Sequence, residues 1–135
     1  MNIVVDTNIL FSAIIKDGLI REKLLDLNNN YLIPEFLFEE IYNHKKELIK
    51  KAKLFEKELD TLLLRLTKYI RIVPTEMIIK YKKEANKIMR NIDPNDSIFI
   101  ATALSFNCPV WSDDRHLKKQ KRIKVYNTKE FIKIT

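Results

Sequence analysis

The stretch that decides the fold is Ile3-Val4-Val5-Asp6-Thr7-Asn8-Ile9-Leu10. Its three consecutive β-branched residues are typical of a short strand that is buried on both faces, as in a parallel sheet. Asp6 ends that strand, and Thr7 can then cap a helix that runs to about Ile15. A strand followed at once by a helix is the first unit of an α/β fold.

The rest of the chain repeats this alternation of short apolar runs and amphipathic helices. Further strands are predicted at Tyr31–Ile33, Ile70–Val73, Pro109–Trp111 and Ile123–Tyr126. Helices are predicted at Leu19–Leu27, from Pro34 to about Lys50, and over Phe55–Leu66. Another begins at Pro74 and has an apolar stripe of Met77, Tyr81, Ala85 and Ile88. Two more are predicted, one from Asp93 through a buried apolar run and one from Thr128 onward. This order predicts one α/β domain over residues 1–135, with a twisted parallel sheet of four or five strands covered by helices on both faces.

The composition limits the classes of protein that fit. The chain has 135 residues, of which 46% are hydrophobic, and this suits one globular domain. The single cysteine, Cys108, cannot form an internal disulfide, so a reducing, cytoplasmic location is expected. The most apolar N-terminal stretch, Ile3–Ile15, carries two polar residues and is too short to span a membrane. The net charge of +7 suits a polyanionic partner such as nucleic acid.

Acidic residues recur where the predicted strands end. Because ligands of open parallel sheets bind at the carboxyl ends of the strands, these acids are expected to lie along one edge of the sheet. They are Asp6 after the first strand, Glu39 and Glu40 in the helix after the second, Asp96 at the start of the buried helix, and Asp113 and Asp114, with Ser112, after the fourth strand.

Crowded carboxylates repel one another, and a divalent cation removes that repulsion. Mg²⁺ prefers oxygen ligands and keeps several waters, so a few aspartates and glutamates suffice to hold it. The sequence has no cluster of cysteine and histidine that would indicate zinc. The acids therefore predict a site for Mg²⁺ or Mn²⁺ that could act on a phosphate ester.

Each of these residues also has a purely structural interpretation. Asp6 could be a turn residue, and Asp96 could complement the dipole of its helix. Asp93 could be a ligand, but it is expected to cap that helix. Glu39 and Glu40 could both be surface residues. His44 and His116, the two histidines of the chain, could bind a metal or transfer a proton beside an acid, but are expected to be solvated side chains.

Four motifs, in this order along the chain, resemble the PIN-domain family of nucleases. They are Val4-Val5-Asp6-Thr7-Asn8-Ile9-Leu10, Pro34-Glu35-Phe36-Leu37-Phe38-Glu39-Glu40-Ile41, Asp96-Ser97-Ile98-Phe99-Ile100-Ala101-Thr102-Ala103, and Trp111-Ser112-Asp113-Asp114-Arg115-His116-Leu117. The resemblance implies a PIN-like three-layer sandwich and a cluster of four acids that is both metal-binding and catalytic: Asp6, Glu40, Asp96 and Asp114. It also implies that five residues orient the ligands or water: Thr7, Asn8, Ser112, Asp113 and Glu39. Two pairs of acids are adjacent in the sequence, so the choice of ligand between Glu39 and Glu40, and between Asp113 and Asp114, stays open.

The activity that this resemblance implies is Mg²⁺- or Mn²⁺-dependent cleavage of RNA phosphodiester bonds. Small single-domain members resemble the toxins of toxin–antitoxin pairs and form homodimers, so an antitoxin protein and a second copy are expected partners. The basic run after Asp114 contains no acid, and its residues Arg115, Lys118 and Lys119 are expected to contact RNA phosphates.

Two other functions compete with this hypothesis. The first is a catalytically inactive PIN-like module that binds RNA or a protein. The second is a different phosphotransfer enzyme or phosphatase on an α/β sheet. The sequence argues against the second function. A covalent aspartyl-phosphate mechanism typically uses a second acid two residues after the first, and no acid stands there after Asp6. A phosphate-binding loop is rich in glycine, and this chain has only Gly18.

Overall fold

The computed structural model describes residues 1–135 and has one sheet of five parallel strands in the order β3-β2-β1-β4-β5. The strands are β1 (Asn2–Val5), β2 (Asn30–Pro34), β3 (Ile70–Val73), β4 (Val110–Trp111) and β5 (Val125–Tyr126). All four pairings between neighbouring strands are parallel. The α/β fold with a parallel sheet, which the sequence predicts, is confirmed.

Nine α-helices and three short 3₁₀ turns connect and cover the strands. The α-helices are α1 (Thr7–Ile15), α2 (Leu19–Leu24), α3 (Glu35–Asn43), α4 (Lys45–Ala52), α5 (Glu56–Tyr69), α6 (Thr75–Ile78), α7 (Lys82–Met89), α8 (Ser97–Phe106) and α9 (Thr128–Ile134). The 3₁₀ turns are η1 (Ile79–Tyr81), η2 (Pro94–Asp96) and η3 (Leu117–Lys119). The longest helix, α5, is amphipathic, and no helix combines the length with the apolar character of a membrane span.

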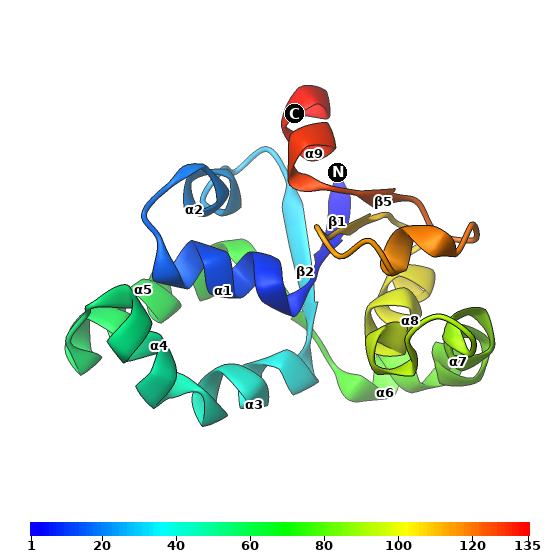
Figure 1. Cartoon of the computed structure of the whole chain (residues 1–135), viewed down its shortest axis with the longest axis horizontal. Coiled ribbons are helices and arrows are strands. Elements are labelled where there is room, and N and C mark those ends of the chain that lie inside the picture. Colours follow the sequence, from blue (N-terminus) through cyan, green and yellow to red (C-terminus); the bar gives the residue numbers. More distant parts are fainter.

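The helices form two layers with the sheet between them (Figure 1). Ile3 and Val5 of β1 pack into a core formed with helices α1 to α5 and α9. Val4 points to the opposite face and packs into a second core formed mainly with α6, α7 and α8. Because successive side chains of a strand point to opposite faces, this one apolar run contributes to both cores.

Three local predictions were wrong. Asp6, and not Thr7, is the N-cap of α1, because its side chain accepts the backbone N–H of Ile9. The helix predicted from Pro34 to Lys50 is interrupted at His44, whose ring packs against Phe11 with centroids 6.0 Å apart. This break allows α4 to pack back against α1.

The third error concerns the helix after Pro74. The turn η1 interrupts the predicted helix and divides it into α6 and α7. Of the predicted apolar stripe, Ala85 is buried and Tyr81 and Ile88 pack against the second core, whereas Met77 is 37% exposed and Ile78 is buried in its place.

The order of the strands brings two distant segments of the chain together. The chain moves from β1 through β2 to β3 on one side of the sheet, and returns to the other side of β1 for β4. Such a reversal leaves a crevice at the carboxyl ends of the two strands. The Asp6 N–H donates to the Trp111 carbonyl oxygen at 3.2 Å, so the residues that follow β1 and β4 are adjacent.

A group of three aromatic side chains holds the last helix against β4. Trp111 stacks on Phe131 of α9 with ring centroids 4.4 Å apart, and Tyr31 contacts both rings. The Trp111 indole also donates to the Thr128 hydroxyl at 3.1 Å. The position of α9 is therefore fixed relative to the loop that follows β4.

We expect Phe131→Ala to lower the free energy of unfolding by about 3–5 kcal/mol, because Phe131 is fully buried. Urea denaturation measures this change. The matched control is Phe55→Ala, whose ring is 79% exposed and whose loss should change stability by about 0.5 kcal/mol or less. Equal effects of the two substitutions would contradict the structural role of the aromatic group.

Candidate functional site

Asp6 is a buried carboxylate with few degrees of freedom. It is 4% exposed, its Oδ1 accepts the Ile9 N–H at 2.9 Å, and its Oδ2 accepts the Ser112 hydroxyl. Burial raises the pKa of Asp6, and the two hydrogen bonds oppose this effect without cancelling it. The charges of Asp113 and Asp114 raise this pKa further.

Ser112 joins two of the predicted ligands. Its hydroxyl donates to Asp6, and the same oxygen accepts the Asp114 N–H at 3.0 Å. The side chain is fully buried, so water does not compete for these bonds. Ser112 thereby fixes the loop after β4 relative to the end of β1.

Asp96 ends η2, directly before α8, and faces the same cluster. Its Oδ2 is buried and has no hydrogen-bond partner. Burial, followed by the neighbouring Asp114 carboxyl, raises the pKa of Asp96 to about 7, and the charges of Asp93 and Asp6 add to this shift. Buried polar atoms are normally satisfied, so an oxygen without a donor among like charges marks a place where a cation would be stabilised.

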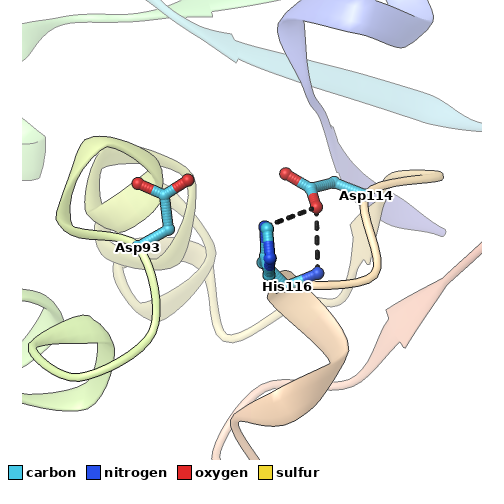
Figure 2. Close-up of side chains that lie close together, drawn as sticks. All are labelled: Asp93, Asp114 and His116. Carbon is cyan, nitrogen blue, oxygen red and sulfur yellow. Dashed lines mark hydrogen bonds and ion pairs between the residues drawn. The ribbon is translucent and has the colours of Figure 1, made fainter.

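Asp114 faces Asp93 and His116 (Figure 2). Its Oδ1 accepts the His116 N–H at 2.9 Å and lies 3.4 Å from His116 Nδ1. One possible ligand atom of each of these three residues lies within 4.8 Å of the other two. Asp93 also caps η2, as predicted, through the Asn95 N–H. The sequence favoured a cap over a ligand for Asp93 and a solvated side chain over a metal ligand for His116, and gave no signal that they would meet beside Asp114.

Asp113 points to a different part of the molecule from Asp114. Its Oδ1 accepts the Thr128 N–H and its Oδ2 accepts the Thr128 hydroxyl, both at 2.7 Å. Both carboxylate oxygens are therefore engaged at the start of α9. Of the two adjacent acids, Asp114 is the one that joins Asp6 and Asp96.

Four other predicted residues form no hydrogen bond or ion pair with the aspartates. Glu40 is half-buried on α3 and Glu39 is exposed, and neither side chain makes a hydrogen bond or an ion pair. Neither glutamate is among the charges that raise the pKa of Asp6 or Asp96. Thr7 is half-buried and Asn8 exposed in the first turn of α1, and their side chains make no hydrogen bonds.

A cleft with a volume of about 540 Å³ opens beside Asp114, between the loop after β4 and α9. Arg115, Lys118 and Lys129 contribute positive charge to its lining. Lys118 is paired with Glu130, whereas Arg115 and Lys129 have no ion pair. Lys119 is exposed and lies outside this cleft. Sequence reasoning missed Lys129, because only the packing of α9 brings it to the site.

The raised pKa of Asp96 predicts how the stability of the metal-free protein depends on pH. Its pKa is about 7 in the folded state and near 3.8 in the unfolded state, so only the folded state keeps the proton between these values. Stability should therefore fall as the pH rises from about 4 to about 7. Asp96→Asn removes this loss, so we expect its Tm in EDTA to exceed that of the wild type by a few degrees at pH 8.

The difference in Tm should shrink towards pH 4, and differential scanning calorimetry across this range checks it. Asp17→Asn is a matched control, because the Asp17 side chain is 88% exposed and lies outside the cluster. A Tm difference for Asp96→Asn that does not change with pH would show that the cluster does not hold this proton.

The comparisons with known proteins concern the family and the fold of this chain. A family model described as PIN domain matches residues 4–130. A search of curated proteins found no match. A similar solved structure is the crystal structure of VapBC2 from Rickettsia felis bound to a DNA fragment from their promoter, with a TM-score of 0.73, 19% identity, and coverage of 94% of this chain and 98% of that chain. At this identity the structural likeness shows the fold alone. Because the family model spans nearly the whole chain, the protein belongs to the PIN domain family.

Proposed function

We propose that this chain is a metal-dependent endoribonuclease that hydrolyses phosphodiester bonds of RNA. The observation that carries the proposal is the buried Asp96 Oδ2, which has no partner and lies in a cluster where the aspartates raise one another's pKa. Membership of the PIN domain family supports a nuclease. The net charge of +7 supports a polyanionic substrate.

The donor set fits a hard divalent cation such as Mg²⁺ or Mn²⁺. Asp6, Asp96 and Asp114 would hold it, with Asp93 and His116 as further donors at the Asp114 side. A cation bound there would supply positive charge that polarises a phosphoryl oxygen and stabilises the leaving oxygen. The resemblance also assigns Glu40 a ligand role, and we propose it as a more distant member of the set.

The chain's own residues would position the substrate and the acids. Arg115 and Lys129 would contact RNA phosphates in the cleft beside Asp114, because both cations lack an ion pair. Ser112 would keep Asp6 and Asp114 in place while the phosphodiester bond of the substrate is cleaved. Glu130 holds Lys118 against α9, so we propose a smaller role for Lys118 in binding RNA.

The biological setting that we propose is the toxin of a toxin–antitoxin pair, acting as a homodimer and neutralised by an antitoxin protein. The resemblance of the four motifs to such toxins supports this proposal. The structural likeness to VapBC2, which extends over 94% of this chain, also supports it. The competing candidate is a PIN-like module that binds RNA without cutting it.

We expect the purified protein to cleave single-stranded RNA when Mn²⁺ or Mg²⁺ is present and to lose this activity in EDTA. Asp6→Asn should lower the rate at least about a hundredfold, because the metal contributes several kcal/mol to the transition state. Asparagine can still accept the Ile9 N–H, so the fold should be retained. Gel electrophoresis of labelled RNA measures cleavage.

The control for this experiment is Asp60→Asn, an exposed acid of α5 that should cleave as the wild type does. Glu40→Gln should have a smaller effect than Asp6→Asn, with Glu39→Gln as its neighbouring control. Cleavage that persists in EDTA would exclude the metal mechanism. Tight RNA binding without any cleavage would favour the inactive module.

His116 should make the site discriminate between metals. Imidazole nitrogen binds Co²⁺ and Ni²⁺ more strongly than Mg²⁺, so His116→Ala should lower the Co²⁺ affinity about tenfold and leave the Mg²⁺ affinity nearly unchanged. Calorimetry and the visible spectrum of bound Co²⁺ measure these changes. The matched control is His44→Ala, since His44 faces Glu47. Equal losses for both metals would show that His116 is not a ligand.

A further inference from the structure

A small apolar pocket lies next to the aspartate cluster and has no role in the site described above. It has a volume of about 230 Å³ and lies between the start of α3, the segment Thr75–Ile79, and the start of α8. Ser97, in its wall, directly follows Asp96 in the chain. One wall residue of the pocket is therefore the direct neighbour of a proposed metal ligand.

The walls of this pocket combine apolar surface with polar groups. Phe36 is 48% exposed and Ile79 is 59% exposed, and both line the pocket. The Ser97 hydroxyl makes no hydrogen bond, and the Lys82 ammonium has no ion pair. An aromatic ring, a free hydroxyl and a free cation offer stacking, hydrogen bonding and charge to one ligand.

We propose that this pocket binds one unstacked nucleobase of the RNA, beside the phosphodiester bond that is cleaved. The inference rests on the proposed ribonuclease function and adds the place where one base of the substrate binds. Phe36 offers a stacking surface to the base, Ser97 offers a hydrogen bond to its edge, and Lys82 neutralises a flanking phosphate.

The size and the charge of the pocket favour a base over an apolar protein segment. Pockets for drug-sized ligands have volumes of roughly 300–1,000 Å³, so this smaller pocket suits a single flat ring system. An apolar side chain of a partner protein would leave Lys82 and Ser97 without partners. A nucleotide satisfies both, because it carries a phosphate and polar edges on a flat ring.

A base inside a duplex is stacked on both faces and paired at its edge. It cannot enter a pocket unless it leaves the stack and breaks its base pair, which costs free energy. Bases of single strands are already free to do so. The pocket thus selects single-stranded segments and loops over continuous helices.

The test is a binding measurement in EDTA with the full chain, so that metal-dependent cleavage does not interfere. The probes are a short fluorescent oligoadenylate and an abasic ribose-phosphate oligomer of the same length and charge. The wild type should bind oligoadenylate about tenfold more tightly than the abasic oligomer. Phe36→Ala and Ile79→Ser should each remove most of this preference, and both side chains are exposed enough for the fold to tolerate the change.

Two controls separate base binding from other effects. Phe55→Ala removes an exposed ring outside the pocket and should keep the preference. Lys82→Gln should weaken both probes to the same extent, whereas Lys83→Gln, whose lysine does not line the pocket, should weaken them less.

The inference is overturned if the wild type does not distinguish the two probes, or if Phe36→Ala keeps the preference. It is also overturned if Phe36→Ala changes only the oligomeric mass in sedimentation, because the pocket is then a protein interface. Base-dependent binding without Mn²⁺-dependent cleavage would refute the proposed ribonuclease activity and support the pocket. Cleavage with no dependence on Phe36 would refute the pocket and support the activity.

Discussion

The hydrogen-bonded series Asp6–Ser112–Asp114 is the interaction on which the candidate site depends. Ser112 donates to Asp6 and accepts from the Asp114 backbone. Asp6 directly follows β1, Ser112 directly follows β4, and Asp114 lies two residues after Ser112. The parallel pairing of these strands places their carboxyl ends side by side. The helices of both layers then enclose this junction, and α9 closes it through the aromatic group around Trp111.

The same arrangement concentrates negative charge in a protein whose net charge is +7. Burial and mutual repulsion raise the pKa of Asp6 and Asp96, so the fold keeps an electrostatically unfavourable cluster in place. The stable hydrophobic cores on both sides of the sheet make this tolerable. Such local instability is typical of functional sites, where geometry is kept for binding and not for the stability of the isolated chain.

Most of the fold was predictable, because short β-branched runs and the order of strands and helices are local features of the sequence. Asp6, Asp96 and Asp114 could be predicted to share an edge, since strand ends define it. The choice between Asp113 and Asp114 could not be made, because it depends on where Thr128 packs. The break at His44 and the meeting of Asp93 with His116 also depend on tertiary contacts that leave no local pattern. The ligand role that the resemblance gives Glu40 has no contact in the structure to support it.

The hydrogen bond between Asp6 and Ser112 joins residues that are 106 positions apart in the chain. During synthesis, Asp6 therefore leaves the ribosome well before β4, its acidic loop and α9. Domains fold as units, so a nascent chain on the ribosome has no assembled aspartate cluster. The cluster can therefore assemble only after β4 and the acidic loop that follows it have left the ribosome.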